Sequence, residues 1–212
     1  MNDIIEKIKQ SNQIIALTGA GMSVESGIAP FRGENGLWEK FDAEKYASYT
    51  SFRKNPERSW ELFKLQIEEV YDAEPHEGHF ALTKLEGKGL DSIITQNIDG
   101  LHKKAGSSGV LELHGTLFKL LCENCSIKYE TDEFIEEIKE GEVPSCAKCG
   151  SILKPDAVLF GEQLPEKVME KSLQKVRRCD LMLVIGTSAV VQPVASLPFI
   201  AKRSKSKIIE IN

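Results

Sequence analysis

The chain has 212 residues, of which 41% are hydrophobic and 28% are charged, and its net charge at pH 7 is −5. This length buries a core in one domain, with or without a small insertion. The negative charge argues against direct nucleic-acid binding as the main role. No stretch approaches the roughly 20 apolar residues of a membrane span or the core of a signal peptide, so we expect a cytoplasmic protein without membrane contact.

Short apolar segments alternate with helical patterns along the chain. An amphipathic helix is expected at 3–11, a strand at 14–18, helical structure from 33 to about 74, and a helix at 79–86. Further strands are expected at 91–96, 110–114, 181–186 and 207–212, with a helix at 166–178. This alternation predicts an α/β protein with a parallel, doubly wound sheet.

The segment after the first strand, Gly19-Ala20-Gly21, has the composition of a phosphate-binding loop. Glycines let a backbone approach a phosphate closely, and a following helix start offers free N–H groups. The dinucleotide fingerprint Gly-x-Gly-x-x-Gly fails at Val24, however, and no ribose-binding acid is clearly placed. The loop therefore suits a dinucleotide but does not suit ordinary hydride transfer.

Small and polar residues also follow the other expected strands. Ligands of parallel sheets bind beyond the carboxyl ends of the strands. The residues at these ends are Gly19-Ala20-Gly21, Gln96-Asn97-Ile98-Asp99, His114-Gly115, Gly186-Thr187-Ser188 and Asn212. The sequence therefore predicts a ligand site along this edge of the sheet.

Asn97, Asp99 and His114 are the candidate catalytic residues. Asn97 donates and accepts hydrogen bonds and Asp99 accepts them, which suits a carboxamide ligand, although the same pair is also typical of a capped turn. His114 at a strand end is placed to act as a general base on a sugar hydroxyl. The other histidines (His76, His79 and His102) are interpreted as packed or surface residues. Arg32 is either a phosphate or sugar-pocket ligand or a surface arginine.

Four of the five cysteines form two Cys-x-x-Cys pairs separated by 20 residues, Cys122 with Cys125 and Cys146 with Cys149. Four thiolates suit one tetrahedral zinc ion with no open position, which indicates a structural metal; the alternative is four unrelated buried cysteines. Cys179 is interpreted as a core residue. The segment 154–162 that follows is either an exposed strand edge, able to pair with a peptide, or a buried strand.

Together these motifs resemble the sirtuins, NAD-dependent protein-lysine deacylases, in their archaeal and bacterial form. The resemblance covers nearly the whole chain in the right order. It rests on Gly19-Ala20-Gly21-x-Ser23, Ser26-Gly27-Ile28, Phe31-Arg32, Gln96-Asn97-Ile98-Asp99, His114-Gly115, the four cysteines, Gly161-Glu162, Gly186-Thr187-Ser188 and Asn212.

The resemblance implies a Rossmann-like large domain made of residues 1–32, 77–118 and 154–212. The smaller lobe would consist of a helical insertion at 33–76 and a zinc ribbon at 119–153. NAD and an acyl-lysine peptide would meet between the two. Because relatives continue beyond the strand that ends at Asn212, we expect the C-terminal part of the large domain to be truncated.

The resemblance also assigns roles to residues. The adenosine and phosphate part of NAD would contact Gly19, Ala20, Gly21, Val24, Gly186, Thr187, Ser188 and Asn212. Gln96 and His114 would contact the nicotinamide ribose. The nicotinamide pocket would consist of Phe31, Arg32, Ile98 and Asp99, with Asn97 nearby. The acyl-lysine peptide would lie as a strand between Val158, Phe160 and Gly161 on one side and Val190 and Gln192 on the other.

The implied reaction consumes NAD. The acyl oxygen attacks C1′ of the nicotinamide ribose, and His114 then removes a ribose hydroxyl proton, giving lysine, nicotinamide and O-acyl-ADP-ribose. Sirtuins that prefer acidic acyl groups carry Tyr-x-x-Arg where this chain has Phe63 and Gln66, so succinyl and malonyl groups are disfavoured. The alternatives are a sirtuin-like protein ADP-ribosyltransferase, an NAD-sensing binding module and, least favoured, a dehydrogenase.

Overall fold

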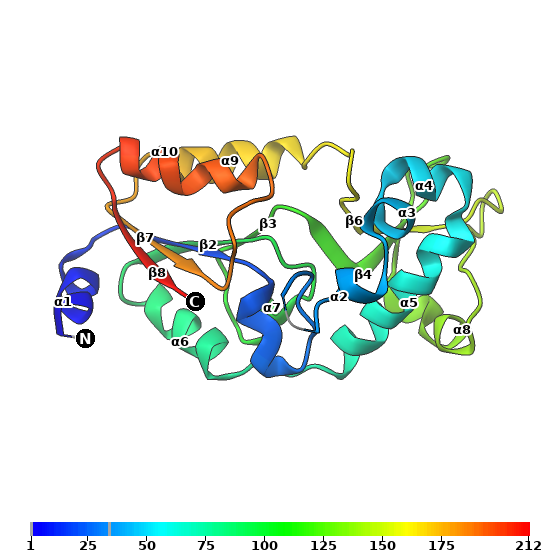
Figure 1. The fold of residues 1–212 in the computed structure, drawn as a ribbon, viewed down its shortest axis with the longest axis horizontal. Helices are drawn as coiled ribbons and strands as arrows, with labels where there is room; N and C mark the ends of the chain where they lie inside the picture. Colours follow the sequence, from blue (N-terminus) through cyan, green and yellow to red (C-terminus); the bar gives the residue numbers. More distant parts are fainter. Residues whose placement is uncertain (1, 34) are drawn as a thin grey trace.

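A computed structural model describes residues 2–33 and 35–212. Five strands form a parallel sheet in the order β3-β2-β1-β7-β8 (Figure 1). They are β1 (Ile14–Thr18), β2 (Leu90–Thr95), β3 (Val110–Glu112), β7 (Leu181–Ile185) and β8 (Lys207–Ile211). These are the five strands that the sequence predicts, and the α/β class is confirmed. The order reverses between β1 and β7, which is where sheets of this kind bind ligands.

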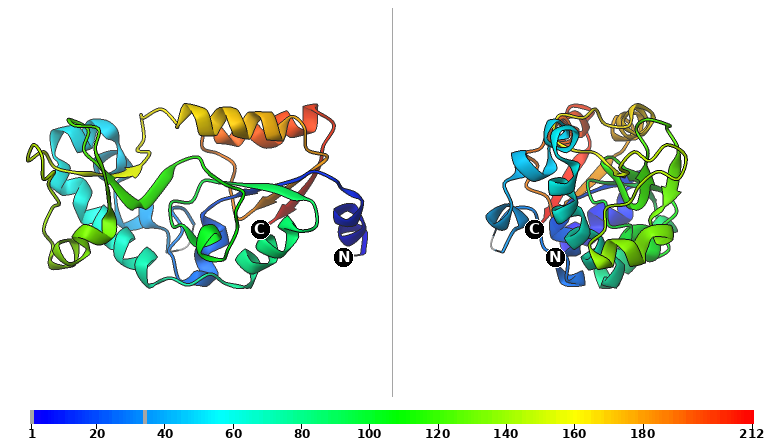
Figure 2. Two further views of the ribbon diagram at one scale, coloured as in Figure 1. Left: turned by 180° about the vertical axis from the view of Figure 1, so that it is seen from behind. Right: turned by 90° about the vertical axis from the view of Figure 1, so that its right-hand side faces the viewer.

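Both faces of this sheet are covered, as its continuous apolar strands require. Alternate residues of β1 point to opposite faces. Ile15 and Leu17 pack toward α9 (Glu166–Val176) and α10 (Leu197–Arg203), which lie along one side of the sheet in both views (Figure 1 and Figure 2). Ile14 and Ala16 pack on the other side, toward α6 (Glu77–Glu86). The β1 strand is therefore completely buried.

A second, antiparallel sheet lies at the other end of the molecule in the order β5-β4-β6. Its strands are β4 (Gly115–Leu121), β5 (Lys128–Glu130) and β6 (Lys154–Ala157). Strand β4 begins three residues after β3 ends, so it connects the two sheets directly. The sequence analysis did not predict β4, which pairs with the nearby β5 and with the more distant β6.

The helical region expected from 33 to about 74 forms four helices in the described residues. They are α2 (Leu37–Lys40), α3 (Ala43–Ala47), α4 (Tyr49–Lys54) and α5 (Pro56–Asp72). The last three each begin at a capping side chain, Asp42, Ser48 or Asn55, which accepts backbone N–H groups of the first turn. These caps explain why the region is divided into short helices.

The remaining helical segments connect these parts. They are α1 (Asn2–Gln10), α7 (Leu101–Lys104) and α8 (Ile135–Glu140), with 3₁₀ turns η1 (Ala20–Ser26), η2 (Thr131–Phe134) and η3 (Val194–Ser196). Across the described ranges, no helix combines the length and apolar character needed to span a membrane.

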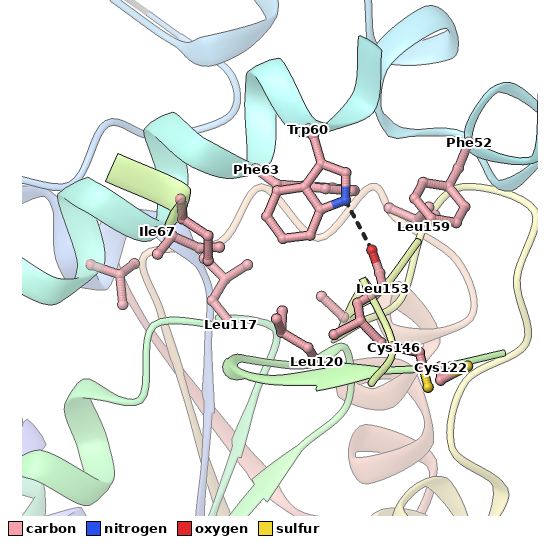
Figure 3. Close-up of a cluster of buried hydrophobic side chains, with 13 residues drawn as sticks. Phe52, Trp60, Phe63, Ile67, Leu117, Leu120, Cys122, Cys146, Leu153 and Leu159 are labelled. Carbon is pink, nitrogen blue, oxygen red and sulfur yellow. Dashed lines mark hydrogen bonds between the residues drawn. The ribbon is translucent and has the colours of Figure 1, made fainter. Parts of the chain in front are cut away.

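Helix α5 and the antiparallel sheet enclose a separate hydrophobic core. Trp60, Phe63 and Ile67 of α5 pack against Leu117 and Leu120 of β4 (Figure 3). The indole Nε1 of Trp60 donates a hydrogen bond of 2.9 Å to the backbone oxygen of Leu153. Two of the cysteines, Cys122 and Cys146, belong to the same cluster. The helical insertion is thus packed directly on the cysteine-bearing segment.

We expect Trp60→Phe to lower the free energy of unfolding by about 1–3 kcal/mol, because it leaves a buried carbonyl unpaired and a small cavity. Urea denaturation followed by circular dichroism measures this loss. Trp38→Phe is the matched control, since the ring nitrogen of Trp38 has no hydrogen-bond partner in the described part of the chain. Equal losses in the two variants would contradict the role of the Trp60 hydrogen bond.

Candidate active site

A cavity of about 1340 Å³ lies at the carboxyl ends of β1, β2 and β7 and reaches to helix α5. Its walls come from the loop after each of these strands, from the segment that follows β6, and from Phe63 and Gln66 on α5. The cavity therefore joins the parallel sheet to the core around Trp60. Its size accommodates a ligand larger than most small molecules.

Most of the residues that the sequence singles out are brought together here. Those that line the cavity are Gly19, Ala20, Gly21, Phe31, Arg32, Gln96, Asn97, Ile98, His114, Val158, Phe160, Gly161, Gly186, Thr187, Ser188, Gln192 and Asn212. Three others lie outside this lining. Val24 and Val190 are exposed, and Asp99 lines an adjoining cavity of about 30 Å³.

The loops after β1 and β7 meet backbone to backbone. Gly186 has φ +59°, and a Cβ atom on it would lie 2.3 Å from the Met22 nitrogen. A Cβ on Gly21 would lie 2.8 Å from the Gly186 Cα, and the Gly21 N–H donates to the Gly186 oxygen at 2.9 Å. Side chains at these positions would push the two loops apart. Val24 faces solvent from η1, so no close approach requires a glycine there.

Ser23, Asn97 and Asp99 form a buried hydrogen-bonded chain. The Ser23 hydroxyl donates to Asp99 Oδ2 at 2.7 Å and accepts from Asn97 Nδ2 at 3.0 Å. Asp99 Oδ1 accepts from the Leu101 backbone N–H at 2.9 Å, so it also holds the turn that leads into α7. Burial raises the pKa of Asp99, and these hydrogen bonds oppose that rise. The sequence analysis gave Ser23 no role, although its position two residues after Gly21 was the available signal.

His114 lies in the turn between β3 and β4, and its ring is held in one tautomer. Its Nδ1 is 2.9 Å from the Gln96 backbone oxygen, which can only accept, so Nδ1 carries the proton. Burial lowers the pKa of His114, and the hydrogen bond to Gln96 partly opposes this. The ring is therefore neutral at pH 7 and its Nε2 lone pair is available as a base.

Two of the other histidines are packed, as expected. His79 and His102 are buried, which lowers the pKa of His79 to about 4 and that of His102 to about 3. His76 is different, because it lines the large cavity and its Nε2 lies 2.6 Å from the Met22 oxygen. His76 thus contacts the loop that follows β1, a position that its sequence context did not indicate.

The segment 154–162 combines the two alternatives left open by the sequence. Its first half is strand β6, and Lys154 is buried in an ion pair of 3.0 Å with Glu162. Beyond β6, the Phe160 N–H donates to the Ala47 oxygen and its oxygen accepts from the Tyr49 N–H, both at 2.9 Å. The Phe160 side chain remains 38% exposed at the cavity. One edge of this segment is therefore paired, while its side chains form a cavity wall.

Arg32 is exposed on the cavity wall and forms no ion pair with any residue in the described ranges. Phe31 beside it stacks on Trp38 with ring centroids 5.3 Å apart. Asn212 also lines the cavity, with its Nδ2 2.7 Å from Glu210 Oε1.

The four paired cysteines converge on one point. Their sulfur atoms all lie within 4.8 Å of one another, and the Cys122 and Cys149 sulfurs are 3.6 Å apart. All four are free thiols. A zinc ion with Zn–S bonds of about 2.3 Å separates tetrahedral sulfurs by roughly 3.8 Å, so the cluster fits zinc. The Tyr129 hydroxyl lies 3.2 Å from Cys146 Sγ. These cysteines stand apart from the residues that line the large cavity, as a structural site requires.

The sequence pattern of the Sir2 family matches residues 19–193 of this chain. The chain belongs to the Sir2 family. NAD-dependent protein deacylase 2 of Archaeoglobus fulgidus is 45% identical over 218 residues, which cover 100% of this chain and 86% of that protein. The NAD-dependent protein deacylase of Thermococcus kodakarensis is 46% identical over 202 residues, covering 93% of this chain and 79% of the relative.

Solved Sir2 structures have the same fold. One, from work on the mechanism and regulation of Sir2 enzymes, superimposes with a TM-score of 0.93 at 45% identity and covers 99% of this chain and 84% of its own. Another holds a p53 peptide and NAD⁺, with a TM-score of 0.90 at 36% identity, covering 100% of this chain and 86% of that one. The Rossmann-like sheet with a smaller antiparallel sheet is thus the Sir2 fold.

We expect the purified protein to contain one zinc ion per chain and to lose several degrees of thermal midpoint when a strong chelator removes it. Metal analysis and a thermal melt measure both. Cys149→Ser is expected to lower the zinc content, whereas Cys179→Ala retains it, because Cys179 packs against α9 and β8 instead. Full zinc content in Cys149→Ser would contradict this ligand set.

Proposed function

We propose that this chain is an NAD-dependent protein-lysine deacylase. It cleaves the bond between nicotinamide and ribose, transfers the acyl group of an acyl-lysine to ADP-ribose, and releases nicotinamide and free lysine. The observation that carries the proposal is the neutral His114, whose unprotonated Nε2 belongs to a wall of the cavity between sheet and helical insertion. Two further findings support the proposal. The similar archaeal proteins are NAD-dependent protein deacylases, and a solved Sir2 structure holds NAD⁺ and a peptide.

The two loops joined by Gly21 and Gly186 are proposed to bind the adenosine and phosphates of NAD. Glycines on both loops let the backbone approach phosphate oxygens closely. Thr187 and Ser188 follow β7, and Asn212 follows β8, so their polar groups border the same end of the cavity. Val24 and Arg32 are proposed to complete the contacts, with Arg32 supplying positive charge near the phosphates or sugar.

Nicotinamide is proposed to lie toward the small cavity lined by Phe31, Asn97, Ile98 and Asp99. The N–H₂ group of a carboxamide can donate a hydrogen bond to a carboxylate, and its oxygen can accept one from an amide or backbone N–H. Asp99 is held by hydrogen bonds from the Ser23 hydroxyl and the Leu101 backbone N–H, so its orientation is fixed before ligand binds. This would hold the ring while its bond to the ribose breaks.

His114 is proposed to act as the general base in the second half of the reaction. After the acyl oxygen has bonded to C1′, a ribose hydroxyl must lose a proton to attack the imidate carbon. Nε2 of His114 is the lone pair available for that proton, and Gln96 positions the ring through its backbone oxygen. The imidazolium formed would be stabilised by the same hydrogen bond.

The acyl-lysine peptide is proposed to lie as a strand between residues 158–161 and 190–192. Val158, Phe160 and Gly161 border the cavity on one side and Gln192 on the other, with Val190 exposed at the rim. We propose that residues 1–32, 77–118 and 154–212 form the NAD-binding domain, and that 33–76 with 119–153 form the smaller one. We also propose a cytoplasmic location, where thiols stay reduced, and no direct nucleic-acid binding.

His114→Ala is expected to lower the rate of free-lysine formation by at least about 100-fold, because the general base is lost. Mass spectrometry of an acetyl-lysine peptide incubated with NAD measures it, and an unchanged thermal midpoint shows that the variant folds. The expected products of the unaltered enzyme are O-acetyl-ADP-ribose and free lysine. ADP-ribose attached to protein with the acyl group retained would instead support the ADP-ribosyltransferase alternative.

The pH profile of kcat/KM should show the depressed pKa of His114. The neutral form is the active one, and its pKa lies below the ordinary 6.5. Activity should therefore hold through neutral pH and fall only as the pH drops below about 6.5. The residual activity of His114→Ala should not fall in this way at acidic pH. If it does, a group other than His114 causes the fall in kcat/KM.

A further inference from the structure

Helix α5 carries one long polar side chain on its buried face. The inward residues Trp60, Phe63, Ile67 and Val70 are apolar, as expected for a helix that packs on a core. Gln66 lies on the same face and is only 8% exposed. A glutamine is rarely so buried unless its amide is hydrogen-bonded.

The amide of Gln66 has no hydrogen-bond partner among the residues that the structure describes, and it is not among their fully buried unpaired groups, so it is accessible from the cavities that Gln66 lines. Leaving such a group unpaired costs free energy, so a ligand or water atom is expected to satisfy it. Gln66 lines both the large cavity and the adjoining small one, so its amide borders space that a ligand can enter.

Several apolar side chains line the large cavity together with Gln66. They include Leu62 and Phe63 from α5, Ala47 from α3 and Leu117 from β4. They accept an alkyl chain but offer it no hydrogen bond. The Gln66 amide can both donate and accept, and it carries no charge to offset a carboxylate.

We propose that the Gln66 amide makes the enzyme favour short acyl chains that carry a hydroxyl group over chains of the same length that lack one. This rests on the deacylase activity proposed above. Burying a hydroxyl in an apolar pocket costs free energy unless the hydroxyl forms a hydrogen bond, and the Gln66 amide is the partner for that bond. A 3-hydroxybutyryl group therefore reacts better than a butyryl group of the same chain length, and a succinyl group reacts poorly.

The experiment compares kcat/KM for acetyl-, butyryl-, 3-hydroxybutyryl- and succinyl-lysine peptides in the unaltered protein and in Gln66→Met. Methionine keeps the length and flexibility of the side chain and removes its amide. Since a neutral hydrogen bond contributes about 1 kcal/mol, the ratio of 3-hydroxybutyryl to butyryl turnover should fall about fivefold or more, from above one to below one.

Ser59→Ala is the matched control. Ser59 is buried on the same helix and its hydroxyl has no partner within the described ranges, but the residue lies outside both cavity linings. Removing its hydroxyl should leave the ratio unchanged. If Ser59→Ala shifts the ratio as much as Gln66→Met, the effect comes from helix packing and the proposal fails.

The KM for NAD and the inhibition by nicotinamide show whether the Gln66 amide binds nicotinamide instead of the acyl group. If Gln66→Met changes these and leaves the acyl ratio unaltered, Gln66 binds the nicotinamide carboxamide and the acyl proposal is overturned. A ratio of 3-hydroxybutyryl to butyryl turnover at or below one in the unaltered protein also overturns the proposal. This measurement decides the question even if Gln66→Met does not fold. If the unaltered protein turns over none of the peptides, the deacylase function itself fails.

Discussion

The contact between the loops after β1 and β7 is the constraint on which the rest of the site depends. Gly21 and Gly186 touch through backbone atoms alone, and either Cβ would fall inside van der Waals distance of the opposite loop. Because the loops close on each other here, the space beyond the strand ends is directed toward the helical insertion. A single large cavity results, bordered by η1 on one side and by the segment after β6 on the other.

The polar groups around this cavity are fixed by neighbours that do not themselves need to react. Ser23 ties Asn97 to Asp99, the backbone of Gln96 selects the tautomer of His114, and Glu162 closes its segment onto buried Lys154. Each restrained group faces a site in which water is partly excluded, where hydrogen bonds and charges act more strongly. The enzyme therefore enters its reaction with the base and the carboxylate already oriented.

The smaller sheet contributes stability and a wall. In its core, the indole of Trp60 is hydrogen-bonded to the backbone of Leu153. Leu153 lies in the chain between the cysteine cluster and the segment that lines the cavity. Zinc, once bound by the four cysteines, would hold the short strands together where apolar burial alone is limited. The same helix that packs on this core presents Phe63 and Gln66 to the cavity, so the core beside the cysteines and this wall of the cavity share helix α5.

The sequence by itself determined the local features: the five parallel strands, the polar residues at their ends and the Cys-x-x-Cys spacing, because apolar runs, turn residues and ligand spacings are written in neighbouring positions. It also supported His114 as the base among four histidines. Only the tertiary structure revealed the role of Ser23, the pairing of β4 with β6, the burial of Lys154 with Glu162, and the place of the Gln66 amide at the cavity. These depend on which distant segments meet, and the hydrogen-bonding state of a buried group is decided by partners far away in the chain.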